Sequence, residues 1–476
     1  MTFRCLCLCV IFLVTGCSLH QTTVVSPPED LPQSYLRSSA DQNGDEATQL
    51  APQRWWTAFE DQQLNTLMQQ MLQNNLALGQ AYARLQQVEA SSRIVRSAQR
   101  PTLSGEADIG RSHQPGIVDD FTGNNQQLSL AAGFELDLWG KLAARSRAAQ
   151  SSLMAAEDEV QTLYLGLSAR LADLYFLAME QRAQLSLNDR SIASFEDTLI
   201  RVEDRYLFGL VPAVDLYQAR QSLAATKAAR YLFESGLAET EHAISILLGH
   251  YPKQQISGVQ AILPKAPVLF ATGVPSQLLT QRPDLRAELQ RIDAADAGVA
   301  AAIADRFPSI RLQGSYGSLR QDVMTGLLTG EFWSLLGSLT LPIVDGGRRE
   351  AEVDRNRAVL EESVLRYEQA VLQAFGEVED ALVNNQSTEQ RIARLAETSK
   401  ATGATLRLST ERYLFGITDY LPVLTAQRSD FEAQSRLLSA QRQLLSDRIS
   451  LARALGGNWM GAEMELRLSQ AKDVTR

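Results

Sequence analysis

Apolar and polar residues alternate along four short segments of the chain, and this period of two predicts β-strands. In residues 127–138 every second side chain is apolar, while the residues between them are small, polar or acidic. The same alternation is found at 102–112, 309–319 and 332–343. Loops containing Gly, Asp and Asn are expected within each strand pair, at 113–126 and 320–331.

A long proline-free segment follows each strand pair and predicts a very long helix. Residues 141–208 and 346–415 contain no proline, and a helix of that length measures about 100 Å. Shorter helices are expected at 62–99, at about 212–248 and at about 418–455. Heptad spacing in the first long segment gives a narrow apolar stripe, which suits helices packed side by side in a wall. The stripe consists of Val160, Tyr164, Leu167, Leu171, Leu174 and Ala178.

The chain contains two copies of one unit. The five residues RYLFG at Arg205–Gly209 recur unchanged at Arg412–Gly416, 207 positions later. The same offset relates turn residues elsewhere, so we infer a duplication with repeats at 61–250 and 282–457. Residues 251–281 form the linker, and 458–476 form a C-terminal tail. Each RYLFG is expected to end one helix and begin the reversal into the next, because glycine favours the left-handed cap that ends helices.

The predicted strands have the features of a membrane-spanning wall. Strands of about ten residues with one apolar and one polar face are typical of transmembrane barrels, although the face of a soluble β-sandwich has the same pattern. Four strands cannot enclose a lumen, and every sheet edge inside a membrane must be paired. If these strands span a bilayer, several chains must share one barrel, and three chains would supply twelve strands.

The N-terminus carries all four cysteines within its first 17 residues. Residues 1–16 combine a basic residue, an apolar run and small residues, as a secretory signal peptide does. The motif VTGC resembles a bacterial lipobox, in which Cys17 is lipidated and becomes the mature N-terminus. The alternative is a plain signal peptide with a chance cysteine. Residues 17–60 then form a lipidated N-terminal segment, and Ser18 favours sorting to the outer membrane by resemblance to enterobacterial lipoproteins.

Composition and motifs point away from catalysis. The net charge of −10 gives no reason to expect nucleic acid as a partner. The four histidines have no metal-binding spacing, and neither a phosphate-binding glycine loop nor a catalytic triad is recognisable. We therefore expect no enzyme activity, no cofactor and no metal.

Several motifs resemble the outer-membrane efflux proteins, the TolC-like channels. These are the duplicated RYLFG and the strand-to-helix junctions ELDLWGK (135–141) and LPIVDGGRR (341–349). Residues 55–75 and 274–289 are similar to the lipoprotein (NodT-type) branch of that family. The resemblance implies a mainly α-helical homotrimer with four strands per chain in a shared twelve-stranded membrane β-barrel. That barrel continues into a twelve-helix periplasmic α-barrel, with an equatorial belt formed by the terminal segments and the linker.

The resemblance also implies a function and partners. Such channels take part in tripartite efflux, together with a periplasmic membrane-fusion adaptor and an inner-membrane pump of the RND, MFS or ABC type. Multiple drugs or small toxic compounds are the expected cargo, and opening is an iris-like movement of the periplasmic helix tips. The alternatives are a type I protein-secretion duct and a periplasmic coiled-coil adaptor without a pore.

The resemblance places a gate at the helix tips, where the family uses acidic and aromatic residues. The candidate gate residues are Asp419, Tyr420 and Asp215. Asp419 is equally well explained as a turn or N-cap residue. Pro422 and Thr425 stand where some relatives carry aspartates, so the resemblance does not define the closed-state network of this chain.

The remaining tip residues are candidates for the surface that faces the adaptor. They are Arg205, Gly209, Arg412 and Gly416. For the two arginines the alternative is a capping role, in which each bonds carbonyl groups of the last helical turn.

Replacing Cys17 by alanine tests the anchor. The Cys17→Ala variant is expected to lose acylation and to remain in the outer-membrane fraction, because the strands themselves hold the protein in the bilayer. Fatty-acid labelling and membrane fractionation measure the two effects. A variant that became freely soluble in the periplasm would contradict the membrane assignment of the strands.

Overall fold

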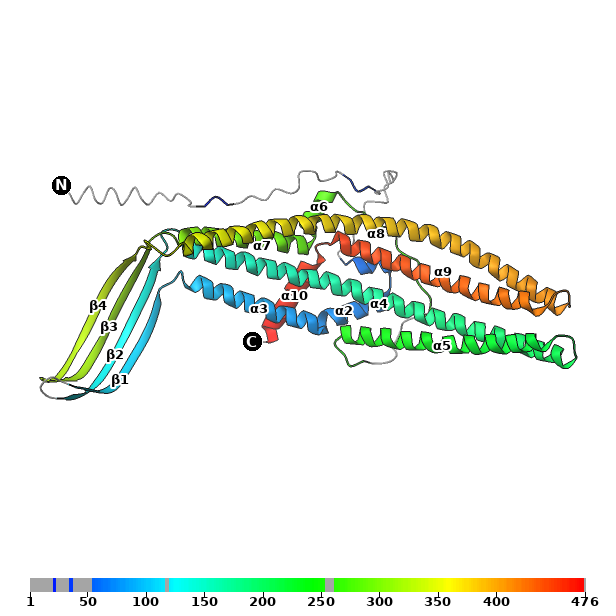
Figure 1. Ribbon diagram of the computed structural model, residues 1–476, viewed down its shortest axis with the longest axis horizontal. Helices are drawn as coiled ribbons and strands as arrows, with labels where there is room; N and C mark the ends of the chain where they lie inside the picture. The colour runs from blue at the N-terminus through cyan, green and yellow to red at the C-terminus, as the bar shows by residue number, and fades with distance from the viewer. Residues whose placement is uncertain (1–19, 23–33, 37–53, 116–119, 253–260, 475–476) are drawn as a thin grey trace. The chain divides into compact units, whose positions relative to one another are not determined.

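The computed structural model describes residues 20–22, 34–36, 54–115, 120–252 and 261–474. Within these ranges the chain is mainly helical, with one antiparallel sheet of four strands (Figure 1). Cys17, the proposed lipidation site, lies outside the described residues. The elements before the linker are η1 (Trp55–Phe59) and, in the first repeat, α2 (Gln62–Asn74), α3 (Leu76–Ser97), β1 (Thr102–Gln114), β2 (Phe121–Leu136), α4 (Lys141–Leu207) and α5 (Ala213–Leu247). Those that follow are α6 (Pro275–Gln281), α7 (Pro283–Ala304), β3 (Ser309–Val323), β4 (Gly326–Thr340), α8 (Arg348–Leu414), α9 (Tyr420–Leu455) and α10 (Trp459–Val474).

The chain divides into two compact units. One, here called the sheet unit, is built mainly from Arg84–Glu157 and Arg286–Gln369 and contains all four strands. The other, the hairpin unit, is built mainly from residues 54–83, Asp158–Leu285 and Ala370–Arg476. Because the long helices α4 and α8 contribute residues to both units, each repeat supplies matching parts to each unit.

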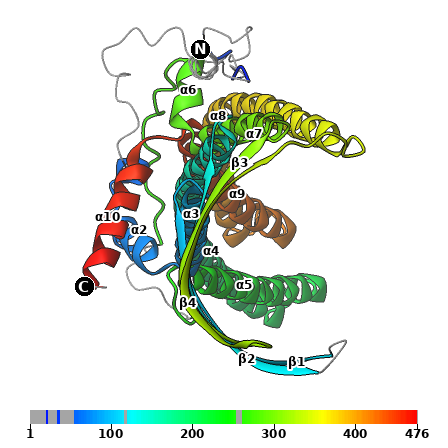
Figure 2. The same ribbon diagram turned by 90° about the vertical axis from the view of Figure 1, so that its left-hand side faces the viewer.

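The sheet brings the two repeats together through its central strands. Its order is β1-β2-β3-β4 (Figure 1), so β2 of the first repeat pairs with β3 of the second. Figure 2 shows that the sheet is curved along its strands. Directly paired residues point to the same face of a sheet. The register aligns Leu130 with Tyr316 and Tyr316 with Trp333, so the apolar side chains of both repeats form one face. The other face carries polar residues, among them Ser315 and Ser334, whose hydroxyls lie 2.7 Å apart.

The apolar face of the sheet is exposed in the single chain. Leu335 is 79% exposed, Trp333 77% and Leu128 64%. Among the described residues, β1 and β4 have no further strand beside them, so each leaves one row of backbone groups without a sheet partner. The sheet of the single chain therefore has an uncovered apolar face and two unpaired edges among the described residues.

The loops expected at 113–126 and 320–331 are wrong, because the strands extend through most of both segments. The β1–β2 ladder continues to the pair Gln114 and Phe121, and the β3–β4 ladder to Val323 and Gly326. The polar residues between them sustain the pairing rather than ending it. For example, the backbone N–H of Asn124 and its side-chain amide both donate to an oxygen of Asp322, at 3.0 and 2.9 Å.

The first strand pair passes into its long helix through a capped junction. The Asp137 carboxylate accepts hydrogen bonds from the backbone N–H groups of Leu142 and Ala143, at 3.0 and 2.7 Å. These are two of the donors that a helix start leaves without a partner. The Trp139 ring donates from Nε1 to the Pro308 carbonyl at 2.7 Å, which ties this junction to the start of β3.

A single helix over 62–99 is also wrong, because Asn75 divides it into α2 and α3. Asn75 has extended backbone angles, with φ −62° and ψ 125°. Its side-chain oxygen accepts from the Leu78 N–H at 3.0 Å, while its amide donates to the Leu247 carbonyl at 2.7 Å. Asn75 therefore begins α3 and holds the end of α5 with one buried side chain.

The apolar stripe of α4 is broader than the heptad pattern indicates. In α8 the corresponding residues are all buried, and they are Tyr367, Val371, Ala374, Val378, Ala381 and Asn385. In α4 further residues are buried, among them Ala172, Phe176 and Met179. The reason is that α4 also packs against the terminal elements, since the rings of Phe59 and Phe176 lie 5.0 Å apart.

None of the described helices is both long and apolar enough to cross a membrane.

The expected C-terminal tail contains a helix, α10, and that prediction is therefore incomplete. Trp459 at its start is buried and packs edge-to-face on Trp56, with ring centroids 4.8 Å apart. Arg467 donates to the Leu72 carbonyl at 2.9 Å. Contacts with Trp56 and with the Leu72 carbonyl, both far away in the sequence, hold this helix in place. A periodic pattern within the tail does not predict them.

We expect replacement of Asn75 by alanine to destabilise the hairpin unit. The change removes one helix cap and leaves the Leu247 carbonyl without its donor, at a cost of about 1–2 kcal/mol in the free energy of unfolding. Urea unfolding followed by circular dichroism of the detergent-solubilised protein measures the change. Ser91→Ala is the matched control, because Ser91 is exposed and its hydroxyl donates to the Gln87 carbonyl within its own helix. Equal effects of the two changes would contradict the joining role of Asn75.

Candidate functional site: the paired helix tips

Each copy of RYLFG ends its helix in the same way. Gly209 has a positive φ of +70° and Gly416 one of +71°, a conformation that glycine adopts at little cost. After the first copy, the Leu210 N–H donates to the Arg205 carbonyl at 2.8 Å and the Gly209 N–H donates to the Tyr206 carbonyl at 2.9 Å. After the second copy, the Ile417 N–H donates to the Arg412 carbonyl at 2.9 Å. The repeated motif is thus a helix-ending signal whose backbone bonds are intact in both copies.

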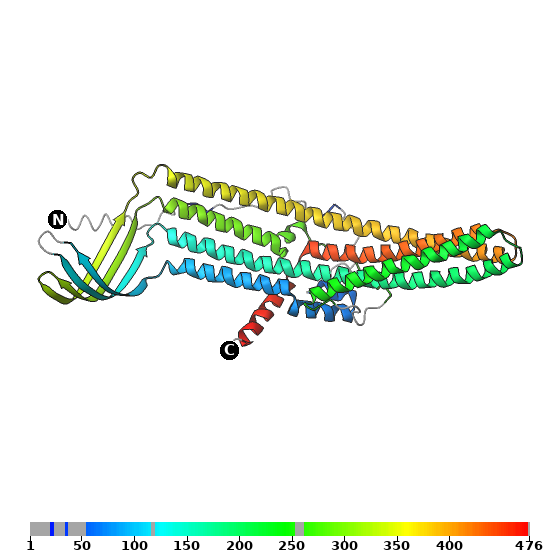
Figure 3. The same cartoon turned by 60° about the horizontal axis from the view of Figure 1, so that its bottom comes forward.

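The two tips of one chain pack against each other (Figure 3). Arg205 of the first copy donates from Nη1 to the Tyr413 carbonyl of the second at 2.6 Å. Its guanidinium carbon also lies 4.7 Å from the centre of the Tyr413 ring, a cation–π distance. Arg205 therefore joins one hairpin to the other instead of capping its own helix. The buried cluster below this contact comprises Phe195, Val202, Leu216, Ala219, Tyr413, Tyr420, Val423 and Leu424.

Tyr420, a candidate gate residue, lies in this cluster rather than on the surface. Its side chain is fully buried, and its ring centroid is 5.9 Å from that of Tyr413. Burial raises the pKa of Tyr420 to about 12. The hydroxyl groups of both tyrosines lack a hydrogen-bond partner among the described residues. In this conformation Tyr420 contributes packing to the tip.

The two candidate gate aspartates differ in exposure. Asp215, in the first turn of α5, is only 9% exposed, whereas Asp419 is exposed and occupies the N-cap position of α9. Burial and then the nearby charge of Asp419 raise the pKa of Asp215. The Asp419 side chain makes no capping hydrogen bond, so the capping explanation fits its position but not its contacts.

Arg412 differs from Arg205 although both begin the same five residues. Arg412 is exposed at the end of α8, and Gly209 and Gly416 lie at the open ends of the two turns. The structure therefore brings together Arg205, Asp215 and Tyr420, and leaves Arg412 on the surface.

A polar seam missed by the sequence reasoning continues from the tips along α4 and α9. Buried Gln427 donates to the hydroxyl oxygens of Thr198 and Ser194 at 2.9 and 3.1 Å. Further along, the Ser439 hydroxyl donates to Glu180 at 2.6 Å. The only sequence signal was the spacing of polar residues on the same face as the apolar heptads, which by itself does not identify their partners.

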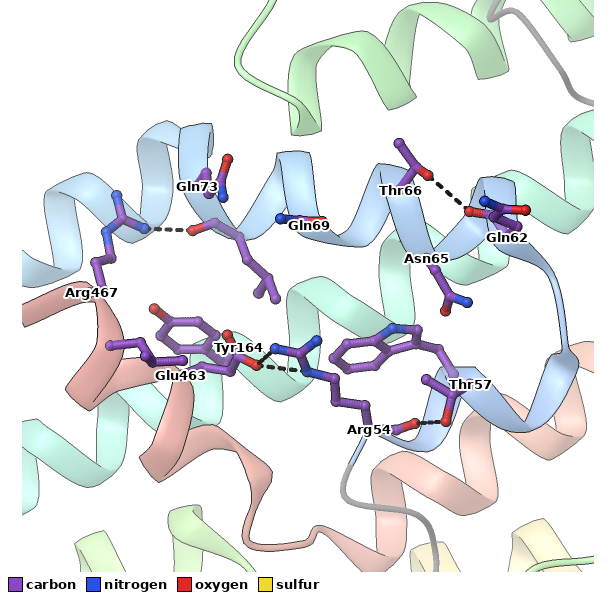
Figure 4. Close-up of a pocket in the computed structure, with 13 residues that line it drawn as sticks. Arg54, Thr57, Gln62, Asn65, Thr66, Gln69, Gln73, Tyr164, Glu463 and Arg467 are labelled. Atoms are coloured by element: carbon purple, nitrogen blue, oxygen red, sulfur yellow. Dashed lines mark hydrogen bonds and ion pairs between the residues drawn. The ribbon is translucent and has the colours of Figure 1, made fainter. Parts of the chain in front are cut away.

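A second candidate site is a pocket of about 540 Å³ in the hairpin unit, between η1, α2 and α10 (Figure 4). Amide side chains line much of it, among them Asn65, Gln69 and Gln73. An Arg54–Glu463 ion pair stands on one side. The described part of the chain has no group of three or more His, Cys, Asp or Glu placed to hold a metal ion. The pocket lining offers hydrogen bonds and one ion pair.

The sequence matches the Outer membrane efflux protein family in two blocks, residues 67–250 and 274–457. The cation efflux system protein CusC of Escherichia coli O6:H1 is 30% identical over 459 residues, which cover 95% of this chain and 98% of that protein. The toluene efflux pump outer membrane protein TtgF of Pseudomonas putida is 29% identical over 462 residues, covering 94% of this chain and 95% of TtgF. The crystal structure of the open state of the Neisseria gonorrhoeae MtrE outer membrane channel matches with a TM-score of 0.79 and 26% identity, covering 92% of this chain and 98% of that one. On these matches, this chain belongs to the outer membrane efflux protein family.

Proposed function

We propose that this protein is the outer-membrane channel of a tripartite efflux system, assembled as a homotrimer. The observation that carries the proposal is the sheet, whose apolar face is exposed and whose two edge strands have no partner among the described residues. Three such sheets placed edge to edge supply the strands of a closed membrane barrel with its apolar face toward lipid. The polar face then lines the passage.

The parts of the chain take distinct places in this proposal. The strands lie in the outer membrane, and the helices form a periplasmic tunnel. The linker and the elements η1, α2 and α10 form a belt around it. Cys17 carries a lipid anchor in the same membrane. The helix tips, with Arg205, Gly209, Arg412 and Gly416, face a periplasmic adaptor that connects the channel to an inner-membrane pump of the RND, MFS or ABC type.

The cargo in this proposal is a small toxic compound, with multidrug efflux as its broad form. Relatives named for cation efflux and for toluene efflux match this chain almost equally well. The channel architecture thus accommodates different cargo, and the pump selects it. A type I protein-secretion duct is the alternative that uses the same architecture with another pump.

The tips supply the gate. Arg205 and the apolar cluster around Tyr420 hold the two hairpins of a chain together. Asp215 and Asp419 place like charges close to that contact. Opening moves the hairpins apart in an iris-like motion, and the repulsion between the carboxylates lowers the work required. Asp419, which is exposed, forms an acidic ring at the mouth in a trimer, and such a ring favours cations over anions.

Planar-bilayer recording tests the channel directly. Purified protein is expected to elute as a trimer in detergent, by light scattering, and to form cation-selective pores. A stable monomer in detergent, or a trimer that conducts no current after insertion, would overturn the proposed function.

The raised pKa of Asp215 predicts a pH-dependent tip. Because the folded pKa lies above the unfolded value, the folded tip binds the proton more tightly, and its stability falls as pH rises above the ordinary carboxyl range. Asp215→Asn should therefore protect the tip at neutral pH and make no difference at a pH below that range. Hydrogen exchange of peptides spanning 200–220 and 410–425, corrected for intrinsic rates, measures the effect. Asp204→Asn, at an exposed position in the last turn of the neighbouring helix α4, is the control. Equal protection of wild type and Asp215→Asn at neutral pH would refute the burial argument.

Asp419 allows charge and size to be separated. Asp419→Asn should reduce cation selectivity with little change in conductance, because it removes the charge and keeps the side-chain volume. Asp419→Ala should also raise conductance, since the shorter side chain widens the mouth. Single-channel current and reversal potential measure both effects. If Asp419→Ala left both quantities at their wild-type values, Asp419 would have no part in the gate.

A further inference from the structure

The two repeats of one chain meet along a row of hydrogen bonds between α4 on one side and α9 with the end of α8 on the other. Its α4 side presents Glu180, Gln184, Thr198 and Arg205. Its other side presents Ser439, Ser435, Gln427 and Tyr413, from α9 and the end of α8. Two of the donors bond backbone carbonyls. Gln184 donates from Nε2 to the Ser435 carbonyl oxygen at 3.1 Å, and Arg205 donates from Nη1 to the Tyr413 carbonyl oxygen at 2.6 Å. We call this the intrachain seam.

The 207-residue repeat assigns every member of this seam a counterpart. On α8 the counterparts are Ser387, Arg391, Thr405 and Arg412. On α5 and the end of α4 they are Leu232, Ala228, Arg220 and Tyr206. All eight counterparts are exposed in the single chain, including Tyr206 at 41% and Leu232 at 73%. The chain therefore carries a second pair of seam faces, and its own fold does not bring them together.

The occupant that fits these faces is a second copy of this chain. A repeat that uses one pair of complementary faces internally leaves the matching pair at its two ends, and a head-to-tail contact of this kind forms a ring when the rotation between copies closes. The donor pattern is kept, because Arg391 and Arg412 stand where Gln184 and Arg205 donate to backbone carbonyls. The acceptor is kept as well, because it is a backbone carbonyl. Tyr206 occupies the position that corresponds to Tyr413 and is also a tyrosine.

The second seam has weaker packing than the first. At the tip, the buried Phe195 and Val202 correspond to Thr402 and Ser409, and Tyr420 corresponds to Ala213. At the other end, Asp173 accepts a hydrogen bond from Ser446, whereas the corresponding pair is Asp380 and Glu239. Two carboxylates facing each other repel, so this bond has no equivalent.

We propose that the exposed face of α8 docks on α5 of a second copy in the 207-residue register, and that Arg412 of one copy donates to the Tyr206 carbonyl of the next. This interchain seam is the weaker of the two around the proposed tunnel, and the mouth opens along it first. The inference rests on the proposed oligomeric channel and adds to it the contacting residues and the order of opening.

Cysteine pairs test the register. Glu180 and Ser439 are in side-chain contact, so their counterparts give the pair Ser387→Cys with Leu232→Cys. In this pair each chain should link to the next, and oxidised membranes should show covalent oligomers on a denaturing gel that disappear on reduction. Each single variant controls for Cys17. Ser387→Cys with Ala225→Cys is the register control, because Ala225 is exposed and lies about 10 Å along the helix from Leu232, beyond the span of a disulfide.

The outcomes separate this inference from the proposed function. A chain that is trimeric by light scattering but forms no oligomer with the Ser387–Leu232 pair overturns the register and leaves the channel intact. Equal cross-linking by the control pair overturns it as well. A monomeric chain in detergent overturns the proposed function itself.

The two arginines test the order of opening. Arg412→Ala should lower the temperature at which detergent-solubilised oligomers dissociate and should raise conductance, whereas Arg205→Ala should loosen the tip by hydrogen exchange with a smaller effect on dissociation. Arg412→Lys retains a donor and should restore part of the loss. A dissociation temperature unaffected by Arg412→Ala would show that the Tyr206 contact is not made.

Discussion

The constraint on which the rest of this structure depends is a sheet that one chain does not complete. Its register aligns the apolar residues of both repeats on a single face, and that face is exposed. In water such a surface is costly in proportion to its apolar area. In lipid the apolar face is favourable, but unpaired edges become the larger cost because no water satisfies them. Only neighbouring strands in an apolar medium meet both demands, and the proposed assembly follows from that requirement.

The helices show how a duplicated chain joins its halves with polar as well as apolar contacts. Between α4 and α9, hydrogen bonds from Gln427 and Ser439 accompany buried apolar residues, some of which form the cluster near the tips. Polar contacts of this kind fix the relative register of two helices while contributing modest net stability. A tunnel wall benefits from that combination, because its helices must remain aligned and still move.

The sequence was sufficient for features that repeat or have a period. The alternation at 127–138 located a strand, and the duplicated RYLFG located two helix reversals. It was insufficient where one contact between distant residues decides the structure. Asn75 breaks a helix by bonding the Leu247 carbonyl, and α10 is held by Trp459 against Trp56. No local pattern encodes such partners. Polar composition likewise suggested loops at 113–126 and 320–331, where cross-strand pairing decides instead.

At the candidate site, the sequence located residues of the tip, and their gate roles stay a prediction. Tyr420, expected at the constriction, is buried in the tip cluster, and Tyr413, whose carbonyl accepts the Arg205 bond, was not among the candidate residues. Both tyrosines bury hydroxyl groups that lack an acceptor among the described residues, and each such group costs about 1–3 kcal/mol. The packed tip thus carries an unfavourable contribution that hydration would remove. In the proposed opening, water that reaches these two phenols as the hairpins separate offsets part of the free energy lost with the apolar contact.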